Sequence, residues 1–279
     1  MSASPSPSGQ AVQSIVARLR VAGCVYAEDE ARLLIEQAQT PAELDAMIDR
    51  RVAGLPLEQV LGWAEFCGLR IALDPGVFVP RRRTEFLVQQ AAALARPPAV
   101  VVDLCCGSGA LGAALLTILD PIELHAGDLD PAAVRCARRN VGADRVSEGD
   151  LYQALPDRLR GRVDILVANA PYVPTEAIGL MPPEARLYEP RVALDGGTDG
   201  LQVLRRVILA SPAWLAPTGY LLVESSERQA PVLVEVMRGS GLVPRVARDE
   251  DLGAVVLIGR LGGTSAVRRT GSEHDVDGL

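Results

Sequence analysis

The chain has 279 residues, of which 48% are hydrophobic and 23% are charged, and its formal net charge is −7. A chain of this length and apolar content can bury a large core, and the length favours one large domain with a smaller one. The negative charge argues against a nucleic-acid backbone as the main partner, because neutralising phosphates requires an excess of Lys and Arg.

No apolar run approaches the length needed to span a membrane, and the start of the chain lacks the charged and apolar segments of a signal peptide. We therefore expect a cytoplasmic protein with no membrane partner. The five cysteines and two histidines show no metal-ligand spacing, so no metal site is expected.

The two ends of the chain differ in composition from the rest. Residues 1–10 are rich in Ser and Pro, and residues 262–279 are polar and unpatterned. Both are predicted to be disordered tails.

Residues 11–64 are predicted to form a small helical domain. Apolar residues recur at helical spacing in three segments of this region, and Asp29 and Thr40 are suited to cap helices. Residues 65–84 follow with an alternating apolar pattern that contains the turn sequence DPG. This pattern predicts a β-hairpin that links the two domains.

Residues 85–261 are predicted to form the larger domain. Strands alternate with helices there, which is typical of a parallel sheet covered on both faces. The predicted strands are 99–104, 122–127, 144–149, 163–168, 218–224, 242–248 and 253–259. The predicted helices are 85–95, 109–119, 131–141, 197–209 and 227–238. The fold class is therefore α/β with a seven-stranded sheet.

A glycine-rich turn follows the first predicted strand of this domain. Gly107, Gly109 and Gly112 have the spacing GxGxxG and lead directly into a helix rich in Ala and Leu. Such glycines let the backbone approach a ligand and let the helix pack closely on the strand. The next strand ends at Asp128, whose carboxylate can accept hydrogen bonds from both hydroxyls of a ribose. Together these features predict a bound nucleoside.

The residues at two further strand ends help to decide which nucleoside-containing ligand is bound. Asp150 and Leu151 follow the third strand, where one could accept an adenine amino proton and the other cover the ring. These features suit both a dinucleotide and S-adenosylmethionine. Asp103, at the end of the first strand, favours the second, because its charge would attract an ammonium and a sulfonium but repel a pyrophosphate.

The fourth strand ends in the sequence NAPY, residues 169–172. An isolated sequence of this kind is typical of a proline-containing turn, but here it lies at the edge of the sheet where ligands bind. The side-chain oxygen of Asn169 and the carbonyl of Ala170 could accept the two hydrogens of one NH₂ group. Both bonds would strengthen as the nitrogen gains positive charge during attack on a methyl group. Tyr172 could offer its ring face to a planar amide or base, and Pro171 confines Ala170 to extended conformations.

With these motifs assembled, the chain resembles the HemK/PrmC protein-(glutamine-N5) methyltransferases over about residues 55–260. The matching motifs are PLEQVLGWAEFCGLRIALDPGVFVPRRRTEFLV, DLCCGSG, DLDPAAVRCARRN, NAPY and YEPRVALDGGTDGL. The resemblance implies a class I S-adenosylmethionine methyltransferase with a Rossmann-like seven-stranded domain and a helical domain that recognises the substrate. It also implies that the motif from Asn169 to Tyr172 holds a glutamine. From the resemblance and the strand ends together, the expected cofactor contacts are Asp103, Leu104, Cys105, Cys106, Gly107, Gly109, Asp128, Leu129, Asp150, Leu151 and Asn169.

The chain departs from the family's motifs at three places. Ala170 replaces the first proline of N-P-P-Y, and the sequence around Ser225 lacks a usual glycine. In the family's P-R-P-E-T-E motif, Arg82 and Arg83 replace a proline and an acid, which predicts either a solvated basic edge or a contact with an acidic protein or RNA surface.

The segment from Val173 to Asp195 is long and contains four prolines. We expect it to lack regular structure and to act as a lid over the glutamine channel, with the turn YEP packing against it.

The leading functional hypothesis is methylation of a glutamine in a translation-related protein, either a release factor with a Gly-Gly-Gln loop or a ribosomal protein. Nucleic acid is expected only as part of such a substrate complex. An adenine-N6 methyltransferase is the main alternative, because the adenine amino group offers the same two hydrogens. A silent module that only binds S-adenosylmethionine and an NAD-dependent dehydrogenase are more distant alternatives.

Overall fold

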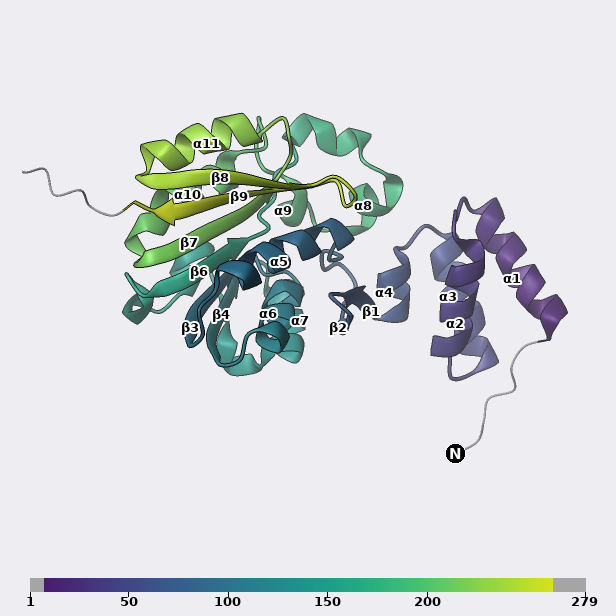
Figure 1. Cartoon of the computed structure of the whole chain (residues 1–279). Coiled ribbons are helices and arrows are strands. Elements are labelled where there is room, and N and C mark those ends of the chain that lie inside the picture. The colour runs from purple at the N-terminus through teal and green to yellow at the C-terminus, as the bar shows by residue number, and fades with distance from the viewer. Residues whose placement is uncertain (1–7, 263–279) are drawn as a thin grey trace, which may run out of the picture.

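The structure, a computed structural model, describes residues 8–262 and shows a helical region beside a larger α/β domain (Figure 1). Of the two predicted tails, residues 1–7 and 263–279 lie outside the described residues. Gly9 and Gln10 were expected in the first tail, but they form the start of helix α1, which the side chain of Ser8 caps. Among the described residues, no helix is long and apolar enough to cross a membrane.

The helical region packs four helices around a small core. They are α1 (Gly9–Val21), α2 (Ala27–Gln37), α3 (Pro41–Val52) and the short α4 (Leu57–Leu61). Leu19, Leu34 and Ile48 are buried where the first three helices meet. The predicted cap Thr40 is confirmed, since its hydroxyl accepts a hydrogen bond from the Glu43 N–H. The predicted cap Asp29 is wrong, because α2 begins two residues earlier and Asp29 lies within its first turn.

A β-hairpin connects the two regions, but its turn is not where the sequence pattern predicted it. Strands β1 (Trp63–Phe66) and β2 (Leu69–Ala72) pair antiparallel around Cys67 and Gly68. Both turn residues have positive φ, 50° and 72°, as a two-residue turn of type I′ requires. The DPG sequence forms a separate turn after β2, in which the Val77 N–H donates to the carbonyl of Asp74.

The predicted seven-stranded sheet is confirmed. Its strands are β3 (Ala99–Leu104), β4 (Ile122–Asp128), β5 (Val146–Glu148), β6 (Val163–Ala168), β7 (Leu215–Ser225), β8 (Leu242–Asp249) and β9 (Ala254–Leu261). They are arranged in the order β5-β4-β3-β6-β7-β9-β8. The first five are parallel, whereas β9 lies antiparallel between β7 and β8. The strand order reverses beside β3, so β3, β4 and β6 bring their carboxyl ends to one crevice.

Helices cover both faces of this sheet (Figure 1). They are α5 (Glu85–Leu94), α6 (Ala110–Ile118), α7 (Pro131–Val141), α10 (Gln202–Ala210) and α11 (Ala230–Gly239). Leu87, Leu115 and Val134 belong to the core on one face. Leu204 and Leu233 belong to the core on the other, so α5–α7 and α10–α11 lie on opposite sides. All five helices were predicted, although α10 begins five residues later than expected.

The segment between β6 and α10 is more regular than the sequence pattern predicted. It contains a 3₁₀ helix (Thr175–Leu180), α8 (Pro183–Tyr188) and α9 (Arg191–Leu194). The expectation that it lacks regular structure is wrong, because prolines here precede or begin short helices, where a missing N–H costs nothing. The segment also contacts the helical region, since Arg51 of α3 pairs with Glu184 at 2.5 Å and the Tyr188 hydroxyl donates to the Ala53 carbonyl at 2.7 Å.

Candidate active site

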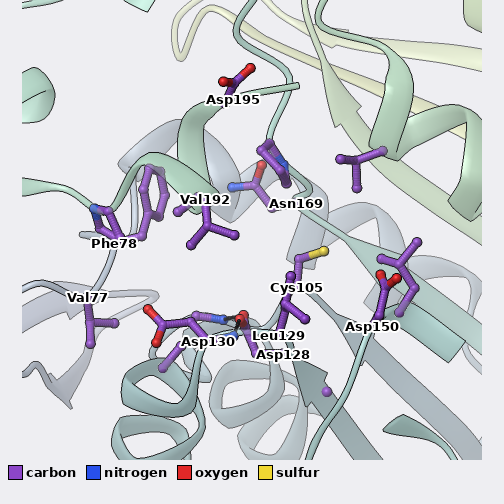
Figure 2. Close-up of a pocket in the computed structure, with 18 of the residues that line it drawn as sticks. Val77, Phe78, Cys105, Asp128, Leu129, Asp130, Asp150, Asn169, Val192 and Asp195 are labelled. Carbon is purple, nitrogen blue, oxygen red and sulfur yellow. Dashed lines mark hydrogen bonds between the residues drawn. The ribbon is translucent and has the colours of Figure 1, made fainter. Parts of the chain in front are cut away.

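A cavity lies at the carboxyl edge of the sheet, beneath α9 and beside the linker that follows the hairpin (Figure 2). The residues that form its wall come from seven separate parts of the chain. They are Val77, Phe78, Cys105, Gly107, Gly127, Asp128, Leu129, Asp130, Ala133, Asp150, Leu151, Asn169, Pro171, Pro190, Val192, Ala193, Asp195, Val203 and Arg206.

The glycine turn forms one side of this cavity and is tied to the end of β4. The Gly107 N–H donates to the Asp128 carboxylate at 2.8 Å. Gly109 adopts φ 77°, and a side chain there would come within 3.1 Å of the Ala137 Cβ, so glycine is required both by conformation and by packing against α7. Cys105 adopts φ 57°, an unusual conformation for a residue with a side chain.

The carboxylate of Asp128 is held firmly at the cavity wall. Its second oxygen accepts a hydrogen bond from the Asp130 N–H at 2.9 Å. Burial raises the pKa of Asp128, while these backbone N–H groups act in the opposite direction. Each oxygen retains a further lone pair, so the carboxylate can still accept hydrogen bonds from a ligand.

Asp150 and Leu151 lie on the same cavity wall. Leu151 has φ 52°, which makes it a second side-chain-bearing residue in the left-handed region. Asp150 is paired at 2.6 Å with Arg206 of α10, a wall residue that the sequence analysis did not single out. One oxygen of Asp150 is therefore engaged by Arg206, and the other is available to a ligand.

Asp103 lies beneath the cavity and does not form part of its wall. Its side chain is fully buried, and one oxygen accepts a hydrogen bond from the Gly112 N–H at 3.1 Å. Its other oxygen has no partner among the residues that the structure describes. Burial raises the pKa of Asp103 to about 7.

The NAPY motif follows β6 and lies across the cavity from the glycine turn. The side-chain nitrogen of Asn169 donates to the Thr84 hydroxyl at 3.3 Å, and Asn169 and Pro171 line the wall. Ala170 is 1% exposed. Tyr172 does not line the cavity, and its hydroxyl donates to Glu224 of β7 at 2.9 Å.

The arginine run at residues 81–83 was expected at a solvated edge or against another molecule. Two of its members instead form ion pairs within the protein. Arg81 pairs with the buried carboxylate of Glu189, from the YEP sequence, and Arg83 pairs with the buried Glu224 at 3.0 Å. YEP therefore packs against the linker through Arg81. Arg82 is exposed.

The structure brings part of the predicted site together around one space. The predicted residues on the cavity wall are Cys105, Gly107, Asp128, Leu129, Asp150, Leu151, Asn169 and Pro171. The predicted residues outside the wall are Asp103, Leu104, Cys106, Gly109, Ala170 and Tyr172. The apolar contributors to the wall, among them Phe78, Val192 and Val203, were not predicted from the sequence. The one available signal in the sequence was that Val192 lies in the segment predicted to be a lid.

The fold and this cavity define a class I S-adenosylmethionine-dependent methyltransferase. A family model described as "Methyltransferase small domain" matches residues 68–181. In fold, the chain is similar to a methyltransferase from Pyrococcus furiosus, with a TM-score of 0.54 and 16% identity over 77% of this chain and 97% of that one. The methyl donor is S-adenosylmethionine, so the dinucleotide alternative is excluded.

More specifically, the chain belongs to the family of release factor glutamine methyltransferases. It is 39% identical over 209 residues to the release factor glutamine methyltransferase of Geobacter sulfurreducens, covering 72% of each chain. It is 32% identical over 259 residues to that of Cereibacter sphaeroides, covering 84% of this chain and 91% of the relative. The resemblance found in the motifs is confirmed.

Proposed function

We propose that this protein transfers the methyl group of S-adenosylmethionine to the side-chain amide nitrogen of a glutamine in a peptide chain release factor. One observation carries this assignment: Asn169 lies on the wall of the cofactor cavity with its amide nitrogen already donating to Thr84. The amide oxygen is therefore the part of Asn169 that can bind a substrate NH₂ group.

The charges on the cavity wall suit the proposed cofactor. The charged side chains of the wall are those of Asp128, Asp130, Asp150, Asp195 and Arg206, four acids against one base. Such a wall attracts the sulfonium and ammonium groups of S-adenosylmethionine and would repel a pyrophosphate. Asp128 is the proposed partner of the ribose hydroxyls, and Leu129 and Leu151 are the proposed apolar contacts of the adenine.

The sequence suggested that Asp103 contacts the cofactor directly, but its proposed role is an indirect one. Because it is buried beneath the wall, its carboxylate can act on the cofactor's positive charge through the field rather than by lining the site. It also holds the first turn of α6 in place through the Gly112 N–H. Cys105 and Gly107 belong to the glycine turn that leads into α6, and they would contact the cofactor there.

The bound cofactor supplies a methyl group on a positively charged sulfur, and the chain's own residues must make an amide nitrogen able to accept it. An amide nitrogen is a poor nucleophile, because its lone pair is delocalised into the carbonyl. Two acceptors, the Asn169 side-chain oxygen and the Ala170 carbonyl, would hold the two amide hydrogens. Among the described residues the Ala170 carbonyl accepts no other hydrogen bond. Both bonds gain strength as positive charge develops on the nitrogen.

Orientation is the second contribution of the site. Pro171 restricts Ala170 to extended conformations, so the two acceptors keep a fixed relation to each other. Holding the nitrogen in line with the methyl group makes the displacement effectively intramolecular, an effect that can reach about 7–11 kcal/mol in well-oriented systems.

The helical region, residues 9–61, is the proposed substrate-recognition domain, and residues 173–195 are the proposed lid. Two contacts support this division of roles: Arg51 pairs with Glu184, and Tyr188 donates to Ala53. The lid residues Pro190, Val192 and Ala193 also line the cavity. The proposed substrate-recognition domain therefore contacts the same segment that lines the cavity.

The names of the relatives support a release factor as the substrate in preference to a ribosomal protein. A release factor acts in translation, so the proposal places the reaction in the cytoplasm. The test incubates the purified chain with methyl-labelled S-adenosylmethionine and a purified release factor, in parallel with a ribosome fraction, and maps the label by mass spectrometry. Label on one release-factor glutamine supports the proposal, and label confined to ribosomal proteins or RNA contradicts it.

A further inference from the structure

We propose that the 3₁₀ turn Arg82–Thr84 positions the NAPY motif, because its adjacent residues Thr84 and Arg83 anchor Asn169 and Tyr172, at the two ends of that motif. This positioning turn lies outside the cavity wall and does not touch the reacting atoms. The inference rests on the proposed function, since it assigns the turn a role in glutamine methylation.

Thr84 determines which way the Asn169 amide faces. Thr84 is 2% exposed, and its hydroxyl accepts the hydrogen bond from the Asn169 side-chain nitrogen at 3.3 Å. With the nitrogen engaged there, the oxygen is left for the substrate. A reversed amide would instead present its own N–H groups to the substrate NH₂, and two donors cannot bond to each other.

Arg83 and Glu224 hold the other end of the motif. The Arg83 guanidinium donates to the Tyr172 hydroxyl at 2.8 Å and to Glu224 at 3.0 Å, while the hydroxyl donates to the same Glu224 oxygen at 2.9 Å. The Glu224 side chain is 2% exposed. A guanidinium fork can reach both acceptors at once, which an ammonium group cannot do in the same planar geometry. Burial raises the pKa of Tyr172, so the hydroxyl keeps the proton that it donates.

The residues on both sides of the positioning turn are themselves fixed. Arg81 pairs with the buried Glu189 at the end of α8, and the Glu85 carboxylate accepts a hydrogen bond from the Cys67 N–H in the hairpin at 3.0 Å. The turn is thus connected to the lid, to the hairpin and to the reactive motif. Arg83 stands where the family motif has an acid.

The first test changes the Thr84 hydroxyl alone. Thr84→Val has nearly the same shape but cannot accept the hydrogen bond, whereas Thr84→Ser retains the hydroxyl. With a release factor as substrate, we expect Thr84→Val to lower kcat at least tenfold and to leave the KM for S-adenosylmethionine within twofold. We expect Thr84→Ser to recover at least half of the wild-type kcat. Equal losses in both variants, or full turnover in Thr84→Val, would overturn the inference.

The second test asks whether Arg83 acts through Tyr172. Arg83→Met and Tyr172→Phe are each expected to lower kcat at least fivefold, and the double variant is expected to fall no further than the worse single variant. Arg82→Met, in the exposed neighbour, is the matched control and should keep its turnover. Losses that multiply in the double variant, or an equal loss in Arg82→Met, would contradict the inference.

A third measurement does not depend on turnover. The five tyrosines are replaced by 3-fluorotyrosine, the S-adenosylhomocysteine complex is observed by fluorine NMR, and the Tyr172 signal is assigned with Tyr172→Phe. We expect Arg83→Met to shift or broaden that signal and Arg82→Met to leave it unchanged. An unchanged signal in Arg83→Met overturns the inference, even if no methylation is detected and the proposed function has failed separately.

Removing Arg83 leaves Glu224 buried without its cation, which could prevent folding. If Arg83→Met does not fold, the double variant Arg83→Met/Glu224→Gln removes both charges and takes its place in the two measurements, with the same expected loss of turnover and the same change in the Tyr172 signal. Wild-type turnover and an unchanged Tyr172 signal in that double variant would overturn the inference.

Discussion

At the scale of single residues, the account gives Asn169 a role in methyl transfer that is separate from cofactor binding. Asn169→Ala removes one acceptor of the substrate amide, so we expect turnover to be lost. We expect the affinity for S-adenosylhomocysteine to stay within about tenfold, because one neutral hydrogen bond contributes only about 0.5–1.5 kcal/mol net. Calorimetry and the transfer assay measure the two quantities on the same preparation. A variant that keeps most of its turnover would refute the role.

Ala170 stands where the family motif has its first proline. Among the described residues its N–H donates no hydrogen bond, so a proline there would forfeit none. We expect Ala170→Pro to remain active and to increase the free energy of unfolding by about 0.4–1 kcal/mol, because it restricts the unfolded chain. Denaturant unfolding monitors the change. A loss of stability would show that the Ala170 backbone cannot adopt the φ that proline requires.

The buried Asp103 makes the stability of the protein depend on pH. Its folded pKa of about 7 lies above the value of 3.8 for an unperturbed Asp. Between those values the unfolded state releases a proton that the folded state keeps, so this group's contribution to stability falls as pH rises through that window. In Asp103→Asn this term is absent, while the amide oxygen can still accept from Gly112.

We therefore compare the free energy of unfolding of Asp103→Asn with that of the wild type at two pH values. As the pH rises from 5 to 7, we expect this difference to shift in favour of the variant by about 2–3 kcal/mol, at 1.36 kcal/mol for each pH unit. Denaturant unfolding of both proteins at the two pH values measures this difference. Parallel stability curves would mean that Asp103 titrates near its ordinary pKa.

At the scale of elements, the segment from Val173 to Asp195 is the one we expect to respond to ligands. Arg186 lies on α8, and Arg191 is the first residue of α9. Both are exposed, and each offers trypsin a cleavage site. If the segment closes over the substrate channel, cleavage at both sites should slow at least severalfold when S-adenosylhomocysteine and a release factor are added together. Cleavage at the exposed Arg160, which precedes β6 at the opposite edge of the sheet from the cavity, is the internal reference. Equal rates with and without ligands would count against a lid.

The elements that were predicted well from the sequence are those with a long run or a regular spacing of buried apolar residues. The strands 99–104 and 163–168 were located to the residue, because continuous apolar runs between turn residues are typical of central parallel strands. The turn of the hairpin was misplaced, because DPG is a stronger turn signal than Cys67-Gly68, whose positive φ values no sequence pattern announces. The five-residue α4 was missed, because it is too short to show helical periodicity.

The site was predictable to the extent that it lies at strand ends. Asp128, Asp150 and Asn169 follow three different strands, and the parallel sheet brings all three to one cavity. The remainder depends on tertiary packing: nothing local distinguishes Val203 or Arg206 from other residues of a helix that covers the sheet. The same holds for the arginine run, whose partners Glu189 and Glu224 lie more than a hundred residues away in sequence.

At the scale of the whole molecule, one chain of contacts connects the proposed substrate-recognition domain to the reactive motif. Arg51 reaches the lid at Glu184, the end of α8 reaches Arg81 through Glu189, and the adjoining positioning turn holds Asn169 through Thr84. Glu189 and Thr84 are buried, so two of these contacts are shielded from solvent. The helical domain and the reactive motif are therefore joined through contacts that do not pass through the sheet.

The cavity and the NAPY motif together are expected to methylate the side-chain amide of a glutamine. The most direct measurement is tandem mass spectrometry of a purified release factor after reaction with the wild-type chain and S-adenosylmethionine carrying a deuterated methyl group. We expect one deuterated methyl on the side-chain nitrogen of a single glutamine, and none when Asn169→Ala replaces the wild type. A label on any other kind of residue, or an equal yield from Asn169→Ala, would contradict it.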